Sequence, residues 1–130
     1  MEVGVANISA GNGLVVTGID RSDYMVEDLD RALAFYRDVL GLEPASADAE
    51  KGAEFELADG SVFGLWMGGA DVPFQPSNGV MFAINDFATA LAEVRSRGVE
   101  VLAQFETAHC SIATFHDSEG NTVNLHKRKN

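Results

Sequence analysis

The chain has 130 residues, a length that fits one domain and leaves no room for a second catalytic domain. Apolar residues make up 46% of the chain and charged residues 22%, a globular composition that excludes extensive disorder. Basic residues number 9 and acidic residues 20, so the formal net charge is −11 and the surface repels nucleic-acid phosphates, which excludes a DNA- or RNA-binding protein.

Simple patterns exclude further classes of protein. The longest apolar runs are far shorter than the roughly 20 residues of a membrane-spanning helix, so no membrane contact is expected. The first 20 residues contain no Lys or Arg, which a secretory signal carries at its start, and we expect a cytoplasmic protein. Cys110 is the single cysteine, so a disulfide within the chain is excluded.

The first half of the chain predicts one helix between strands. Residues 1–17 are expected to form an extra strand or a packed arm, and a short strand follows over Gly18–Val26. A helix is predicted over Leu29–Leu40, because apolar residues recur at helical spacing between a capping Asp28 and Gly41. Two more strands are predicted over Glu54–Ala58 and Ser61–Met67.

The second half repeats this order after a linker over residues 68–78, which holds two of the three prolines. A strand over Val80–Ile84 precedes a helix that begins after Asp86 and ends before Gly98. Three strands follow, over Glu100–Phe105, Ile112–His116 and Thr122–His126.

The two halves align at an offset of 58 residues. Asp28 corresponds to Asp86 at the start of each helix, and the same offset pairs Asp59 with Asp117 in a turn. A module of about 55 residues with one helix buries too little surface alone, so both modules are expected to share one core. The sequence therefore predicts an α+β fold and a single domain over residues 1–130, with tandem βαβββ modules at 18–67 and 79–127.

Two segments resemble the signature motifs of the vicinal oxygen chelate superfamily, which includes glyoxalase I, bleomycin-resistance proteins and extradiol dioxygenases. The first, VEDLDRALAFYRDVLGL, spans residues 26–42, and the second, FHDSEGNTVNLH, spans residues 115–126. The resemblance implies that the two βαβββ modules form a half-open barrel with a central cavity and that the protein is a homodimer. It also implies a divalent metal held by four side chains, one on each of four strands.

The four metal-ligand positions of that superfamily fall on residues that are poor metal ligands. They correspond to Arg21, Gly64, Gly79 and Asn124. Arginine keeps its proton and repels a cation, and glycine has no donor atom in a side chain. We therefore expect no metal and no other cofactor. This departure argues against the superfamily's metal-dependent activities, but it leaves the cavity in place.

Strand alternation, anchored on these positions, predicts which side chains line the cavity. Arg21, Asp23 and Met25 share one strand face, and Asp23 is expected to hold Arg21 so that the guanidinium binds an acidic group of a ligand. Trp66 and Met81 form a flat apolar wall suited to an aromatic or amphipathic ligand. The alternative interpretations are that Arg21 and Asp23 form only a surface ion pair, and that Trp66 and Met81 only pack in the core. The predicted ligand-binding residues are Arg21, Asp23, Met25, Trp66, Met81, Asn124 and His126.

Glu54 and Glu56 share one face of their strand, and we expect that face to point to solvent. His109, Cys110 and His126 offer an alternative metal site, and Cys110 an alternative nucleophile, although scattered polar and core residues are the simpler interpretation.

Two functions stay open. The first is a metal-free protein that binds a small aromatic or amphipathic molecule. The second is a lyase, isomerase or dioxygenase-like enzyme with an unusual metal site or with metal-free acid–base chemistry. The expected partners are a small-molecule ligand and a second copy of the chain.

Overall fold

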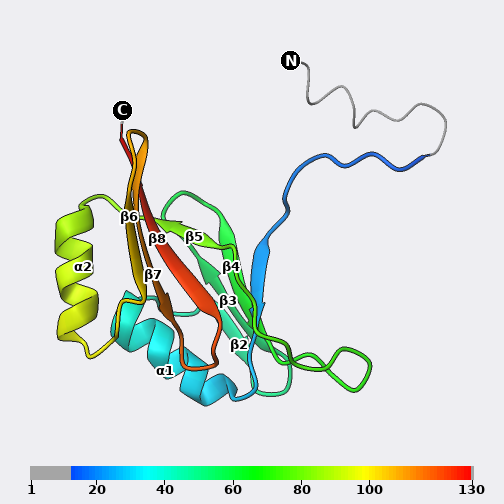
Figure 1. Cartoon of the computed structure of the whole chain (residues 1–130). Coiled ribbons are helices and arrows are strands. Elements are labelled where there is room, and N and C mark those ends of the chain that lie inside the picture. The colour runs from blue at the N-terminus through cyan, green and yellow to red at the C-terminus, as the bar shows by residue number, and fades with distance from the viewer. Residues whose placement is uncertain (1–12, 130) are drawn as a thin grey trace.

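Two four-stranded sheets and two helices make up the structure (Figure 1), a computed structural model that describes residues 13–129. The first module contains β1 (Ser22–Met25), α1 (Leu29–Leu40), β2 (Ser46–Asp48), β3 (Gly52–Glu56) and β4 (Val62–Trp66). The second contains β5 (Met81–Ala83), α2 (Phe87–Ser96), β6 (Ala103–Glu106), β7 (Cys110–His116) and β8 (Thr122–Arg128). The strand orders are β1-β4-β3-β2 and β5-β8-β7-β6, so the predicted tandem βαβββ fold is confirmed.

The structure departs from the sequence prediction at the edges of the first module. Strand β2 was not predicted from the sequence, because it has only three residues, all exposed, and no large apolar side chain that would mark a half-buried strand. Residues 13–17, the described part of the predicted N-terminal strand or arm, form no strand, and residues 1–12 lie outside the described residues. Neither helix within residues 13–129 has the length and apolar content to cross a membrane.

Helix α1 begins and ends at the residues expected from the sequence. The Asp28 side chain accepts a hydrogen bond from the Arg31 backbone N–H at 3.0 Å, which caps the first turn. Gly41 follows the helix with φ 71°, a left-handed conformation that favours glycine. The buried side of the helix consists of Leu29, Ala32, Tyr36 and Val39.

Aromatic rings fill the space between the two sheets. We call the sheet face that packs against this core the inner face and the opposite one the outer face. The rings of Phe63 in β4 and Phe82 in β5 meet edge to face with centroids 5.0 Å apart, so the inner faces of the two sheets touch directly. Tyr36 packs against Phe55 and Phe63, with centroid distances of 6.1 and 5.5 Å. One shared aromatic core therefore serves both modules.

The two modules use equivalent hydrogen bonds, but the offset between them changes along the chain. Before the helix, Val26 donates its N–H to the Trp66 carbonyl at 3.0 Å, and Ile84 donates to the His126 carbonyl at 3.2 Å. The first residues of these pairs differ by 58 in number and the second residues by 60. The segment between the helix and the last strand is therefore two residues longer in the second module.

This change of offset corrects one predicted pairing. In both modules the first residue of the turn before the last strand donates its N–H to a carbonyl four residues on, at 2.9 Å: Leu57 to Ser61 and Asp117 to Asn121. Asp59 therefore corresponds to Glu119. The predicted pairing of Asp59 with Asp117 was wrong, because it carried the offset of the helices past the two additional residues.

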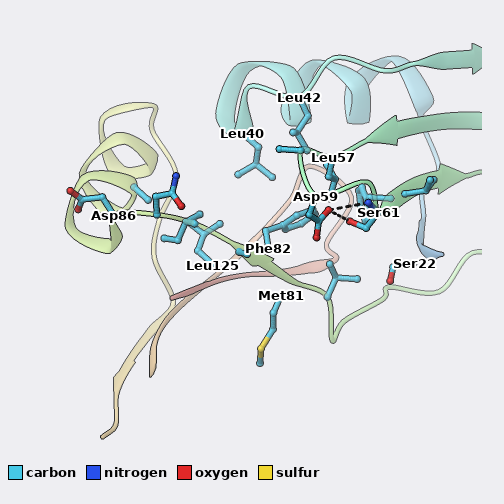
Figure 2. A pocket seen from close by; sticks show the side chains of 18 of the residues that line it. Ser22, Leu40, Leu42, Leu57, Asp59, Ser61, Met81, Phe82, Asp86 and Leu125 are labelled. Atoms are coloured by element: carbon cyan, nitrogen blue, oxygen red, sulfur yellow. Dashed lines mark hydrogen bonds between the residues drawn. The ribbon is translucent and has the colours of Figure 1, made fainter. Parts of the chain in front are cut away.

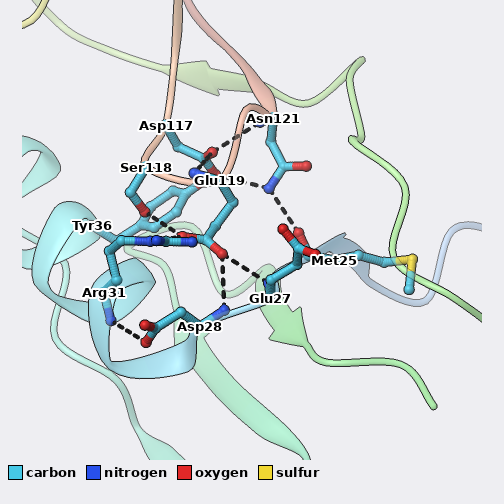
Figure 3. A network of polar contacts seen from close by, with 9 residues as sticks. All are labelled: Met25, Glu27, Asp28, Arg31, Tyr36, Asp117, Ser118, Glu119 and Asn121. Atoms are coloured by element: carbon cyan, nitrogen blue, oxygen red, sulfur yellow. Dashed lines mark hydrogen bonds and ion pairs between the residues drawn. The ribbon is translucent and has the colours of Figure 1, made fainter.

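The turn at residues 117–121, which we call the clamp turn, joins the two modules through a buried carboxylate (Figure 3). Glu119 Oε1 accepts hydrogen bonds from the backbone N–H groups of Glu27 and Asp28 at 2.8 and 2.9 Å, and Oε2 accepts from Arg31 Nε at 2.6 Å. The backbone ahead of a helix has N–H groups without a partner inside the helix. A side chain of the second module thus satisfies backbone groups at the start of α1.

Other side chains of the clamp turn reach the first module as well (Figure 3). The Tyr36 hydroxyl donates to Asp117 Oδ2 at 2.7 Å, and Asn121 Nδ2 donates to the Met25 carbonyl at 2.8 Å. Asn121 Oδ1 accepts from the Ser77 N–H at 2.7 Å. Throughout residues 13–129, no buried side-chain nitrogen or oxygen lacks a hydrogen-bond partner. The two segments that carry the superfamily resemblance therefore meet in one satisfied polar network.

Opposing effects set the pKa of Glu119. Burial raises it, but hydrogen bonds from Arg31, from the N–H groups of Asp28 and Glu27 and from the Ser118 hydroxyl outweigh burial and hold the pKa at about 2. The unfolded chain has a Glu pKa of about 4.3. Because the folded pKa is the lower one, this group stabilises the fold above the unfolded value and loses that contribution as the pH falls toward 2.

We predict that Glu119→Gln lowers the free energy of unfolding by about 3 kcal/mol at pH 7, because the neutral amide cannot replace the charged acceptor. The difference between wild type and variant should shrink as the pH falls from about 5 to 3, which urea unfolding at several pH values measures. Glu93→Gln is the matched control, because its ion pair with Arg97 is exposed and its loss should cost less than about 1 kcal/mol. A difference for Glu119→Gln that stays constant with pH would contradict the assignment.

Candidate functional site

The outer face of the first sheet carries four of the seven predicted ligand-binding residues. Arg21 precedes β1, and Asp23 and Met25 alternate along it toward the outer face. The strand register places Asp23 beside Gly64 of β4 and Met25 beside Trp66. Trp66 is 39% exposed, which is unusual for the residue with the largest apolar side chain. This face therefore combines charged groups with an exposed aromatic surface.

Arg21 is held by two carboxylates. Its Nε lies 3.0 Å from Asp23 Oδ2, its Nη2 lies 2.7 Å from Asp23 Oδ1, and its Nη1 forms an ion pair with Glu54 Oε2. Hydrogen bonds to Asp23 and then to Glu54 raise the pKa of Arg21 above its ordinary value. The predicted ion pair of Arg21 and Asp23 is thus present. Glu54 is exposed, as expected, and it adds a second carboxylate to the same guanidinium.

Gly64 makes room for this ion cluster. A Cβ atom at position 64 would lie 1.9 Å from Asp23 Oδ1 and 2.2 Å from Arg21 Nη2. The charged side chains therefore lie directly over the glycine, in the space that a larger side chain there would fill.

The ion cluster changes the expected role of Arg21. One guanidinium between two carboxylates leaves a net charge of −1, and the bidentate contact with Asp23 occupies one edge of the guanidinium. Two N–H groups of the guanidinium remain, but an acidic ligand group would meet a cluster that is already negative. This geometry argues against the expectation that Arg21 binds a ligand carboxylate.

The residues at the four ligand positions do not fit a metal. Arg21 is fixed as a cation over Gly64, and neither residue has a side chain that offers a lone pair to a metal. Asn124 uses both ends of its amide within the second sheet: Oδ1 accepts from Thr114 Oγ1 at 2.8 Å and Nδ2 donates to the Val80 carbonyl at 3.0 Å. Gly79 has no side chain to contribute.

The other three predicted residues lie on the outer face of the second sheet. The register pairs Met81 of β5 with Asn124 of β8, and Ala83 with His126. Met81 is exposed, and Asn124 and His126 are half-buried. Within the described residues, no group of three or more His, Cys, Asp and Glu side chains is arranged to hold a metal ion, so the alternative set of His109, Cys110 and His126 does not form a cluster.

The structure does not bring the seven predicted residues around one cavity of a single chain. Arg21 and Trp66 line a shallow hollow of about 340 Å³ on the first sheet, together with Glu54 and residues of β2. Met81 lines a separate cavity of about 750 Å³. Neither of these two hollows is lined by the other predicted residues, Asp23, Met25, Asn124 and His126. Glu54 comes beside Arg21 because the register of β3 on β4 places it opposite Gly64, and alternation within one strand does not give that register.

The larger cavity lies between the modules (Figure 2). Its walls come from the end of α1, the turn before β4, strand β5 and the start of α2. Most of the lining is apolar; Figure 2 shows Asp86 on one side of the cavity and Asp59 and Ser61 on the other. The remaining polar residues of the lining are Ser22, Asn85 and Thr89. This cavity was not predictable from the sequence, because it forms where segments from different modules meet.

Comparison with known proteins identifies the family. The sequence model of the Glyoxalase/Bleomycin resistance protein/Dioxygenase superfamily matches residues 18–125. The chain therefore belongs to this superfamily, as the two motifs predicted. A search of the curated proteins gives no match.

Several solved structures share this fold. The antibiotic-binding protein TnmS3 from a Streptomyces species superposes with a TM-score of 0.76 at 18% identity, covering 89% of this chain and 99% of that chain. A lactoylglutathione lyase from Agrobacterium tumefaciens gives 0.73 at 20% identity, covering 86% and 94%. A glyoxalase/bleomycin resistance protein from Catenulispora acidiphila gives 0.65 at 25% identity, covering 82% and 94%. A binding protein and an enzyme both share the fold, so fold alone assigns neither activity.

We predict that Gly64→Ala changes the free energy of unfolding by less than about 1 kcal/mol, because the atoms that it displaces are the ends of half-exposed side chains. Gly52→Ala should cost more than about 2 kcal/mol, since its Cβ would lie 1.9 Å from the backbone oxygen of Leu65 at φ 152°. Thermal and urea unfolding measure both. Equal destabilisation by the two variants would show that the ion cluster over Gly64 is rigid.

Proposed function

We propose that this chain binds a small planar aromatic molecule on the outer face of the first sheet, beside Trp66, without a metal. The observation that carries the proposal is the exposed indole next to a hollow whose polar side is the ion cluster of Arg21, Asp23 and Glu54. An aromatic side chain exposed beside a hollow is a typical feature of a ligand-binding surface.

Charge selects among aromatic ligands. The ion cluster has a net charge of −1, and the hollow is also lined by Asp48 and Lys51, which cancel each other. The whole chain carries −11. A cationic or neutral ring therefore meets less repulsion than an anionic one. The Trp66 face also attracts cations by its ring quadrupole.

A second copy of the chain belongs to this proposal, because the hollow of about 340 Å³ is too open to enclose a ligand by itself. Large apolar side chains are exposed on the outer faces of both sheets: Trp66 at 39%, Met81 at 52% and Phe105 at 55%. A partner copy whose outer face lies over this one would bury these side chains and cover the ligand.

Ligand binding can be followed at the site itself, because Trp66 is the single tryptophan. We predict that planar aromatic compounds of similar size quench its emission saturably, with the cationic compound binding more tightly than the neutral one and the anionic one most weakly. The substitution Trp66→Ala should lower the affinity for the ligand at least tenfold, because it removes the stacking surface. Calorimetry measures this affinity, since the variant has no tryptophan emission. Leu102→Ala, an exposed apolar residue elsewhere, is the control. No saturable quenching by any of the three compounds would refute the proposal.

The predicted dimer has its own test. Light scattering at micromolar concentration should give twice the chain mass of 13.9 kDa. Low ionic strength should weaken the dimer, since two chains of −11 each repel more strongly when salt does not screen them. A monomer at all salt concentrations would contradict this part of the proposal.

A further inference from the structure

The cavity of about 750 Å³ occupies the place in the second module that the clamp turn fills in the first. Glu27 and Asp28, ahead of α1, correspond to Asn85 and Asp86, ahead of α2. Both helices carry an aspartate N-cap of nearly the same conformation, φ −125° and ψ 104° for Asp28 and φ −130° and ψ 105° for Asp86. Asn85 and Asp86 line the cavity.

Corresponding backbone donors have different partners in the two modules. The N–H groups of Glu27 and Asp28 donate to the Glu119 carboxylate. Within the described residues, the N–H groups of Asn85 and Asp86 donate to no acceptor of the chain. The first module thus has its pair of donors occupied by a side-chain oxygen, and the second has the same pair open at a cavity.

Three substitutions account for the difference. Asp59, the counterpart of Glu119, is one methylene shorter and folds back on its own turn, where its Oδ1 accepts from Ser61 N and Oγ at 3.0 and 2.6 Å. Thr89 replaces Arg31, so no cation faces the donors. Leu57 replaces Asp117 and gives the cavity an apolar wall in place of a carboxylate.

We propose that this cavity is a second ligand site, independent of Trp66, that binds a neutral amphipathic molecule through a carbonyl oxygen. The carbonyl accepts from the N–H groups of Asn85 and Asp86, as the Glu119 oxygen does in the first module. The apolar part of the molecule packs against the apolar residues that line the cavity, among them Leu40, Leu42, Leu57, Phe82 and Ala90.

Charge favours a carbonyl over a carboxylate here. The lining contains no Lys or Arg and includes Asp59 and Asp86. Hydrogen bonds from Ser61 lower the pKa of Asp59, and the backbone N–H of Thr89 lowers the pKa of Asp86, so both stay ionised. Without a counterpart of Arg31, an anionic ligand would meet uncompensated repulsion.

The test uses the neutral naphthalene ketone prodan and the anionic probe 8-anilinonaphthalene-1-sulfonate. Prodan should bind the full chain saturably, with blue-shifted emission, and at least tenfold more tightly than the anionic probe. Asp59→Glu combined with Thr89→Arg rebuilds the clamp, so it should raise the melting temperature and lower prodan affinity at least tenfold. Ala90→Leu fills the cavity and should lower the affinity similarly, which keeps the test valid if the double variant does not fold.

Trp66→Ala is the control and should leave prodan affinity within twofold, whatever the result of the Trp66 quenching experiment. The proposal is overturned by absent prodan binding, by unchanged affinity in the folded cavity variants, or by loss of binding in Trp66→Ala. Tighter binding of the anionic probe would also overturn it, because the cavity would then favour negative charge.

Discussion

The buried carboxylate of Glu119 sets how the two halves of this chain fit together. A buried negative charge is tolerated only with close donors, and here those donors are two backbone N–H groups and one guanidinium of the other module. The requirement fixes the clamp turn over the start of α1. Asn121 in the same turn binds the Met25 carbonyl, so it also fixes the end of β1, which follows Arg21 and carries Asp23 and Met25 at the outer face. The geometry of the proposed ligand surface therefore depends on a contact made to the backbone of the edge strand β1.

The two modules have similar backbones but different side chains at corresponding positions. Caps, strand order and the hydrogen bonds that close each turn recur in both modules. The side chains at corresponding turns differ by small steps, one methylene between Glu119 and Asp59 and one cation between Arg31 and Thr89. These steps are sufficient to turn a tight junction into a cavity, because a carboxylate that does not reach its donors leaves both the donors and the space open.

Features fixed within a few residues of each other were predictable from the sequence. The aspartate caps and Gly41 mark α1 locally, and strand alternation placed Asp23 beside Arg21. Features that depend on segments far apart were not. Glu54 was missed as the third ion partner, because its contact depends on the pairing of β3 with β4 across from β1. The pairing of Asp59 with Asp117 failed because two additional residues between helix and turn are invisible to a fixed offset. Strand β2 was missed because every residue in it is exposed.

The position of the clamp turn along the chain has a consequence for synthesis. Glu119 lies 92 residues after Glu27 and 88 after Arg31, so the donors at the start of α1 leave the ribosome long before their acceptor exists. The first module emerges with its helix junction unsatisfied and with aromatic side chains of its inner face uncovered. Contacts of such long sequence separation form late and slow folding. The nascent first half is therefore expected to stay unfinished, and open to capture by chaperones, until the final strand hairpin has been made.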